Sequence, residues 1–390
     1  MRPLLRFRSW RSRQSVSVIV PTRDAGAELE ECLGAVVRQR GVGPLELLVV
    51  DSGSEDHTLD VARRFGAKVL SIPRAEFNHA ETRDRAVAAA TSEFVLLTVQ
   101  DAVLRQRDAI SRLVSELERD PRLAAVSAQQ VARDDADRFG AFLVHAHNRV
   151  TREARVAGQP SRPAMDNVCA MIRRQAWVAV RFRRIPFGED LDFAVRARER
   201  GWHSTISDSV QVVHSHRRPP VYHLRRNVLE RVYGAPLVGD DKSSSAAAEG
   251  LDAVAASAQR LLGEVEAVLA AIRGSAPFVA LAAHISAFRE TLAVCREPAA
   301  PSGELAVLAE AIGAAPPEDP VVTARMRAEL NGFLSWYVLT DFVARRQAPT
   351  AEADDFLVKS TATVIGRIAG DAIRVSPEET TLARRLMADV

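Results

Sequence analysis

Three apolar runs in the N-terminal part of the chain each end in a short polar cluster, and this feature constrains the fold more than any other. The runs are VSVIV, LELLVV and EFVLLTV, and the clusters after them are PTRD, DSGSED and QDA. Continuous runs of branched apolar residues are typical of strands buried on both faces of a parallel sheet. Because ligands of open α/β sheets bind beyond the carboxyl ends of the strands, we expect these clusters to face one crevice.

Helical patterns separate the predicted strands. Apolar residues recur at helical spacing over residues 27–40, a capped helix is predicted at 56–65, and a further helix at about 80–90 follows the strand KVLSI. This βαβαβαβ order predicts a Rossmann-like parallel sheet with right-handed crossovers.

The pattern continues beyond the QDA cluster with a helix at 108–119 and the strand LAAVSAQQV. We interpret residues 133–162 as charged and irregular, with prolines near the end that favour a loop. The segments NVCAMIRR, LDFAVRARERGW and STISDSVQVVHSH then predict strand, helix and strand. A fourth polar cluster, GED at residues 188–190, opens the helix of this group.

Length and composition predict four segments. The 390 residues, of which 47% are hydrophobic and 26% charged, are enough for two or three domains with real cores. We expect a basic tail at 1–14, an α/β domain at 15–238 and a hydrophilic linker at 239–250. Residues 251–390 repeat apolar residues at spacings of three and four, which predicts an all-α bundle that is suited to forming a homo-oligomer.

Charge, cysteine content and hydropathy exclude several classes of function. A net charge of +2 does not favour nucleic acid as a partner. Three widely spaced cysteines form no metal-binding spacing or disulfide framework, so we expect a reducing cytoplasm. No uncharged apolar stretch has the roughly 20 residues needed to cross a bilayer. The tail MRPLLRFRSWRSR lacks a signal-peptide core, so we expect it to be retained, either solvated or resting on an anionic membrane surface.

Oxygen and nitrogen ligands for a divalent cation occur at two strand ends. Asp101 follows a predicted buried strand and is preceded by Gln100, which adds an amide oxygen at the same edge. His214 and His216 lie two residues apart, so they share one face of the predicted last strand, where an imidazole can complete a metal site. The alternatives are that Asp101 caps a turn and that the histidines are ordinary polar residues near a strand end.

Other carboxylates are candidates for binding a nucleotide or for acid–base chemistry. Asp51 ends the second strand, where its carboxylate could accept hydrogen bonds from a base or a ribose, or cap the next helix. Glu189 and Asp190 lie on a turn that opens a helix, where the helix dipole stabilises anions. One of them is a candidate general base if a substrate hydroxyl comes within reach.

Six segments together resemble one enzyme family. VSVIVPTRD, LLVVDSGSEDHT, FNHAETRDRA, LLTVQDA, GEDLDFAVRARERGW and VVHSH occur in the order found in glycosyltransferase family 2, and the match covers about residues 15–235. The FNH loop and the QDA motif are most similar to the rhamnosyltransferase-like branch. The resemblance implies a GT-A fold, which is a mostly parallel Rossmann-like sheet flanked by helices.

The resemblance also implies roles for particular residues. Asp101 and His214 would bind Mg²⁺ or Mn²⁺, Asp190 would be the catalytic base, and Glu189 would orient it or replace it. Asp84 stands where the family usually has asparagine, so it offers Arg83 a protein partner in competition with the substrate. The residues that would contact the nucleotide diphosphate are Pro21, Thr22, Asp24, Asp51, Arg83 and Gln100.

The function implied is an inverting, metal-dependent transfer of a sugar from a nucleotide-sugar donor to a hydroxyl group. The branch implies dTDP-L-rhamnose as donor, while UDP and GDP sugars remain alternatives. The basic tail and the helical region favour a glycan or lipid-linked envelope acceptor met at the inner face of the cytoplasmic membrane. Two other classes remain open: a non-catalytic nucleotide-sugar-binding scaffold and a nucleotidyltransferase, although PTRDAGAEL is a poor match to the glycine-rich loop of the latter.

Overall fold

The computed structural model describes residues 14–156, 164–237 and 239, together with part of 355–371. The predicted tail, the linker after Gly239 and most of the predicted helical bundle therefore lie outside the described residues. These residues form two compact units, one made of 14–136 and 141–215, the other of 137–140 and the described residues from 216 onward.

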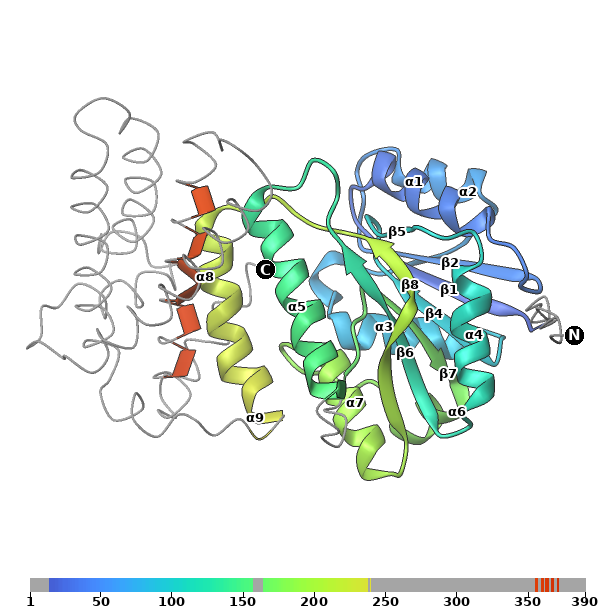
Figure 1. The fold of residues 1–390 in the computed structure, drawn as a ribbon. Coiled ribbons are helices and arrows are strands. Elements are labelled where there is room, and N and C mark those ends of the chain that lie inside the picture. Colours follow the sequence, from blue (N-terminus) through green and yellow to red (C-terminus); the bar gives the residue numbers. More distant parts are fainter. Residues whose placement is uncertain are drawn as a thin grey trace, which may run out of the picture. The chain divides into compact units, whose positions relative to one another are not determined.

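An eight-stranded sheet organises the first unit, in the order β3-β2-β1-β4-β7-β6-β8-β5 (Figure 1). Six strands run in one direction, while β7 and the short β5 are antiparallel to their neighbours. The strands are β1 Val16–Thr22, β2 Leu45–Asp51, β3 Lys68–Ser71, β4 Phe94–Thr98, β5 Val103–Leu104, β6 Leu123–Val131, β7 Cys169–Arg173 and β8 His203–Val213. The predicted fold class, a mostly parallel sheet flanked by helices, is confirmed for this part of the chain.

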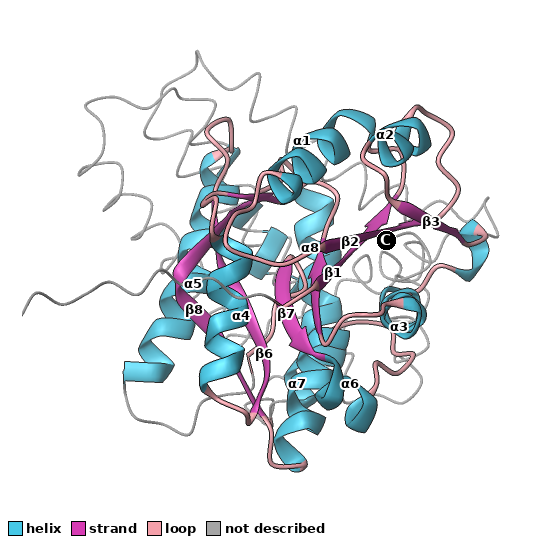
Figure 2. Cartoon of the chain, turned by 90° about the vertical axis from the view of Figure 1, so that its right-hand side faces the viewer, coloured by secondary structure: helices cyan, strands magenta, loops and turns pink. Residues whose placement is uncertain are grey.

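Helices cover both faces of the sheet (Figure 2). Those connecting its strands are α1 Gly26–Val37, α2 Thr58–Arg64, α3 His79–Ala89, α4 Ala109–Arg119, α5 Arg138–Val156, α6 Arg174–Val180 and α7 Glu189–Glu199, with a 3₁₀ turn at Arg74–Glu76. Alternate residues of β1 belong to two hydrophobic cores, one on each face of the sheet. Val18 packs with residues of α1, α2 and α4, and Ile19 packs with residues of α3, α6 and α7. Burial on both faces explains why the strands are continuously apolar.

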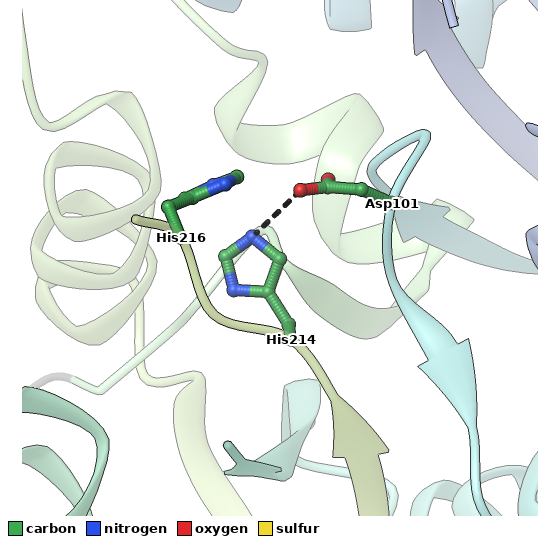
Figure 3. A group of neighbouring side chains, drawn as sticks. All are labelled: Asp101, His214 and His216. Carbon is green, nitrogen blue, oxygen red and sulfur yellow. Dashed lines mark ion pairs between the residues drawn. The ribbon is translucent and has the colours of Figure 1, made fainter. Parts of the chain in front are cut away.

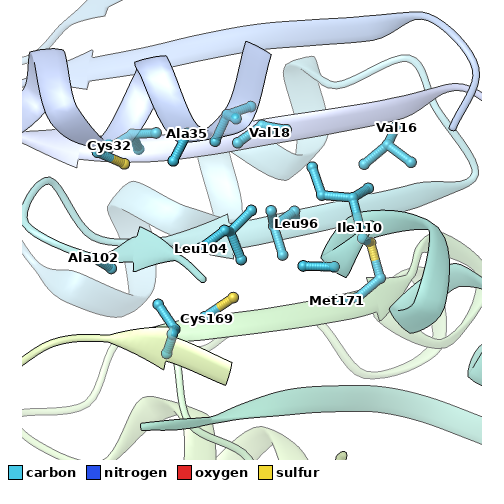
Figure 4. Close-up of a cluster of buried hydrophobic side chains, with 14 of the residues drawn as sticks. Val16, Val18, Cys32, Ala35, Leu96, Ala102, Leu104, Ile110, Cys169 and Met171 are labelled. Carbon is cyan, nitrogen blue, oxygen red and sulfur yellow. The ribbon is translucent and has the colours of Figure 1, made fainter. Parts of the chain in front are cut away.

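Two cysteines belong to the first of these cores (Figure 4). Cys32 and Cys169 are both free and buried. Burial raises the pKa of the Cys32 thiol to about 12, and the nearby Asp101 carboxylate adds to that shift. Both residues therefore pack as small apolar side chains.

The prediction for residues 133–162 was wrong, because most of this region is the helix α5. Its charged side chains obscured an apolar spacing that includes the fully buried Phe139. The sequence also gave no sign that β7 reverses direction. That reversal brings the amino end of β7 to the same edge as the carboxyl ends of its neighbours, since Cys169 pairs with Thr98 at the end of β4.

The second unit is helical where it is described. It contains α8 Pro220–Leu229, a π-helical turn at Glu230–Gly234 and α9 Ala235–Leu237. Helical residues of the 355–371 segment pack closely on α8, since a Cβ added to Gly366 would clash with the Leu224 carbonyl oxygen. None of the helices in the described part of the chain is long and apolar enough to cross a bilayer.

Candidate active site

The two predicted metal ligands, Asp101 and His214, come together with His216 beyond the ends of β4 and β8 (Figure 3). One ligand atom from each of Asp101, His214 and His216 lies within 4.8 Å of the other two. His214 Nε2 is 3.6 Å from Asp101 Oδ2, and the two side chains are only 11% and 12% exposed. Figure 3 shows both imidazole rings and the carboxylate directed toward the same space. One carboxylate and two imidazoles therefore form a donor set that fits a divalent cation.

A residue of the neighbouring strand β6 contacts the ring nitrogen of His214 that does not face Asp101. His214 Nδ1 is 3.0 Å from Oε1 of Gln130, near the end of β6. Gln130 Nε2 in turn donates a hydrogen bond to Asp166 Oδ2, at 2.5 Å. Asp101 is also fixed at its backbone, because the Arg133 guanidinium donates to its carbonyl oxygen at 3.1 Å.

The paired carboxylates lie at the N-terminus of α7, where Gly188 adopts a positive φ of 76° that favours glycine. Glu189 Oε1 accepts hydrogen bonds from Arg83 at 2.7 Å and from the Asn167 amide at 3.0 Å. Burial would raise the pKa of Glu189, but the positive charge of Arg83, with His79 and Asn167, holds it below its usual range. Glu189 is therefore an ionised member of a buried ion pair.

The adjacent carboxylate has the opposite electrostatic environment. Burial raises the pKa of Asp190 to about 7, and the negative charges of Glu189 and Asp166 contribute to that shift. Its oxygens accept hydrogen bonds from the backbone N–H groups of Leu191 and Asn167. Two neighbouring carboxylates whose pKa values are displaced in opposite directions are an arrangement suited to acid–base chemistry near neutral pH.

A single loop connects the metal-ligand cluster with the carboxylate pair. Within residues 166–168, Asp166 bonds Gln130 and the next residue, Asn167, bonds both Glu189 and Asp190. The loop is tied to the sheet because Thr98 at the end of β4 donates to the Val168 carbonyl oxygen at 2.9 Å. The structure thus brings the predicted metal ligands and the predicted base to the same edge of the sheet.

The loops after β1 and β2 hold one another. Asp51 accepts bonds from the Gly53 and Ser54 N–H groups and from the Ser54 hydroxyl, so it caps its own turn. It does not cap the next helix, as one interpretation of the sequence expected, because the N-cap of α2 is His57. Asp24, with a φ of 45°, accepts from the Glu55 N–H at 2.8 Å. Contacts of Asp51 and Asp24 with a nucleotide remain a prediction.

The other predicted donor contacts lie on the same loops. Gln100 Oε1 accepts from the Arg23 N–H at 2.8 Å, which links the ends of β1 and β4. Pro21 and Thr22 are the last residues of β1, and the hydroxyl of Thr22 is buried without a hydrogen-bond partner within the described part of the chain. A buried hydroxyl without a partner is costly unless water or a ligand satisfies it.

Arg83 has a different partner from the one the sequence suggested. The expected pairing with Asp84 was wrong, because the Asp84 carboxylate instead accepts bonds from Arg181 and from the indole of Trp177. Arg83 points to the other side of α3, where it is buried against Glu189. Contact of Arg83 with a donor diphosphate remains a prediction.

Sequence reasoning missed three polar residues of this edge, Gln130, Asp166 and Asn167. Each adjoins an apolar strand run: Gln130 near the end of LAAVSAQQV, and the other two just before VCAMIRR. The rule that selected Asp101 would have found Gln130. It would not have found Asp166 and Asn167, because only the antiparallel direction of β7 places residues that precede this strand at the site.

Part of the chain matches a known protein family. Residues 17–178 match the family described as Glycosyl transferase family 2. This part of the chain belongs to that family. The matched residues include the strands β1 to β7 and the Asp166–Asn167 loop, and the predicted resemblance is confirmed.

Two curated relatives of the matched part of the chain come from Salmonella. The O-antigen chain rhamnosyltransferase WbaN of Salmonella anatum is 29% identical over 225 residues, which cover 54% of this chain and 70% of that protein. The O-antigen chain rhamnosyltransferase RfbN of Salmonella typhimurium is 36% identical, over 34% of this chain and 41% of its own length.

Two solved structures are also similar to this glycosyltransferase. A mannosyltransferase from Pyrobaculum calidifontis in complex with GDP-Man and Mn²⁺ is 20% identical, with a TM-score of 0.47, over 78% of this chain and 86% of that one. Glucosyl-3-phosphoglycerate synthase from Mycobacterium tuberculosis, in complex with Mn²⁺, UDP and phosphoglyceric acid, is 20% identical over 58% of this chain and 78% of that one, with a TM-score of 0.43.

Proposed function

We propose that this glycosyltransferase inverts the anomeric centre of its donor sugar, binds Mn²⁺ through Asp101 and His214 with His216 beside them, and uses Asp190 as the catalytic base. The observation that carries the proposal is that a carboxylate–imidazole cluster and a carboxylate with a pKa of about 7 lie on one edge of the sheet. When bound, the cation would neutralise charge that develops on the departing nucleoside diphosphate. The donor set favours Mn²⁺ over Mg²⁺, since Mg²⁺ prefers oxygen ligands.

Asp190 is better suited than Glu189 to accept a proton from the acceptor hydroxyl. The Glu189 carboxylate is held by Arg83 and Asn167, and its lowered pKa makes it a weak base. Asp190 has a raised pKa, so its carboxylate takes up a proton more readily near neutral pH. The Leu191 and Asn167 N–H groups fix its orientation, and Glu189 together with Arg83 fixes the position of the turn.

We further propose that the sugar is L-rhamnose, donated as dTDP-L-rhamnose to a hydroxyl of an envelope glycan or a lipid-linked acceptor in the cytoplasm. This choice is supported by the two relatives whose names describe O-antigen chain rhamnosyltransferases. A UDP or GDP sugar as donor is the first alternative. A non-catalytic nucleotide-sugar-binding scaffold is the second, and the presence of both a metal-ligand cluster and a shifted carboxylate disfavours it.

Removal of a metal ligand tests the proposal. Hydrolysis of dTDP-L-rhamnose, UDP and GDP sugars is measured on the full chain with Mn²⁺, with Mg²⁺ and with neither. We expect Mn²⁺-dependent turnover of dTDP-L-rhamnose, lowered about 10²- to 10³-fold in Asp101→Ala and His214→Ala, as loss of several kcal/mol of charge stabilisation implies. Asp108→Ala removes a half-exposed ion pair between the N-cap residue of α4 and Arg112, and this control should match the wild type. Wild-type turnover in Asp101→Ala would refute the site.

The pH dependence tests the role of Asp190. Because this carboxyl must be ionised to act as a base and its pKa is about 7, kcat/KM should fall as the pH decreases below about 7. Asp166→Asn removes one of the negative charges that raise this pKa, so the acidic limb should move to lower pH. Asp208→Asn makes the same charge change at an exposed site on β8 and should leave the limb in place. An unmoved limb in Asp166→Asn would contradict the assignment.

A further inference from the structure

His214 presents its two ring nitrogens to different partners. Nδ1 lies 3.0 Å from Gln130 Oε1, and Nε2 is directed toward Asp101, 3.6 Å from Oδ2. A neutral imidazole carries its hydrogen on only one of these nitrogens, and the other has the lone pair that a metal requires. Whichever group fixes the hydrogen therefore decides whether His214 can be a ligand on the Asp101 side.

The Gln130 amide could bond His214 through either its oxygen or its nitrogen, and Asp166 decides which. An ionised carboxylate only accepts hydrogen bonds, so the amide NH₂ of Gln130 must face Asp166 Oδ2, 2.5 Å away. The amide oxygen then faces His214, and Nδ1 of that ring must carry the hydrogen. The lone pair is left on Nε2, on the side of Asp101.

The three residues of this hydrogen-bonded series, Asp166, Gln130 and His214, are fixed in place by neighbouring groups. Asp166 Oδ1 accepts from the Val168 N–H at 3.0 Å, and the Asp166 N–H donates to the Ser127 hydroxyl at 3.0 Å. Gln130 is paired with Val212 across β6 and β8, and His214 lies two residues after Val212, directly beyond the end of β8. The positions of the amide and the imidazole are thus set by the sheet itself.

We propose that Gln130 and Asp166 are positioning residues that select the Nδ1–H tautomer of His214 and so prepare Nε2 to bind the cation. The inference rests on the proposed function, in which His214 is a metal ligand. Neither residue touches the ligand atom. Their effect is to fix the ring orientation and to raise the basicity of Nε2 through the bond at Nδ1.

The tautomer itself can be observed in the metal-free protein. ¹⁵N NMR of the histidine side chains distinguishes a protonated ring nitrogen from one that carries a lone pair, and His214→Gln identifies the resonances. Above the pKa of the ring, we expect protonated Nδ1 and unprotonated Nε2 in the wild type. Gln130→Leu should lose this preference. A wild-type His214 protonated at Nε2 would overturn the proposal without reference to activity or to any variant's stability.

Binding of Mn²⁺ alone, measured by electron paramagnetic resonance, tests the consequence. We expect Gln130→Leu to weaken Mn²⁺ binding about 10- to 100-fold, the usual effect of losing a partner of a ligating histidine. The double variant Gln130→Glu with Asp166→Asn reverses the donor and acceptor of the central bond at constant net charge, while its carboxylate still accepts from Nδ1. It should bind Mn²⁺ within about threefold of the wild type.

The control is Gln129→Leu, at the preceding position of β6, where the side chain projects to the opposite face of the strand. Wild-type Mn²⁺ affinity in Gln130→Leu, or no recovery in the folded double variant, would overturn the inference. The outcome is distinguishable from failure of the proposed function. If Asp101→Ala also binds Mn²⁺ like the wild type, the metal site itself is wrong, whereas lost binding in Asp101→Ala with normal binding in Gln130→Leu refutes only the positioning role.

Discussion

Replacing Asp190 with asparagine is expected to lower kcat about 10²- to 10⁴-fold, the range that a general base contributes. The amide has nearly the shape of the carboxylate, and its oxygen can still accept one of the two backbone hydrogen bonds that Asp190 accepts, from Leu191 and Asn167. It cannot take a proton from the acceptor hydroxyl. Donor affinity should therefore change little. Rates under saturating donor and acceptor, together with KM for each, measure the effect.

Protein stability separates a chemical role of Asp190 from a structural one. Because its folded-state pKa is raised, the folded protein retains a proton between about pH 4 and 7 that the unfolded chain has already released, so this group lowers stability as pH rises through that window. Asp190→Asn removes the free-energy cost of ionising this buried carboxyl. The free energy of unfolding of the variant at pH 8 should therefore be no lower than that of the wild type. Glu199→Gln, at the exposed far end of α7, is the matched control. Retained kcat in a folded Asp190→Asn would refute the base.

Replacing Arg83 with methionine is expected to destabilise the fold by about 3–5 kcal/mol, the usual effect of removing one partner from a buried ion pair. The side chains of Arg83 and Glu189 are 4% and 13% exposed, so the carboxylate would remain in a poorly solvated place without its cation. The pKa of Glu189 should then rise, because the charge of Arg83 is what holds it down. Urea unfolding at neutral pH measures the free-energy change.

The same helix offers a matched control for Arg83. Arg85 lies two residues further along α3 and pairs with Glu81 and Glu76, but its side chain is 51% exposed. Arg85→Met should lower the free energy of unfolding far less than Arg83→Met, because exposed ion pairs contribute little to stability. If the two substitutions destabilise the fold equally, the buried ion pair of Arg83 with Glu189 contributes no more to stability than the exposed ion pairs of Arg85. The electrostatic explanation of the low Glu189 pKa would then be lost.

The strands and the edge on which the site lies were predictable from local patterns. VSVIV, LELLVV and EFVLLTV became β1, β2 and β4, and the polar residues after them lie at one edge because parallel neighbours end together. The helix at about 80–90 was confirmed as α3, with Asn78 capping it through the Glu81 N–H. The helix α5 was missed because its buried residues are spread among charged ones.

The amino-acid sequence by itself determined which polar residues follow β1, β2 and β4, because an apolar run and the residues directly after it are local properties of the chain. Only the tertiary structure decided what each group does there. The partner of Arg83 lies 106 positions away on α7, and the partner of His214 lies 84 positions away on β6. A proton's position depends on burial and on charges within a few ångströms, and such neighbours are brought together by folding and not by sequence spacing.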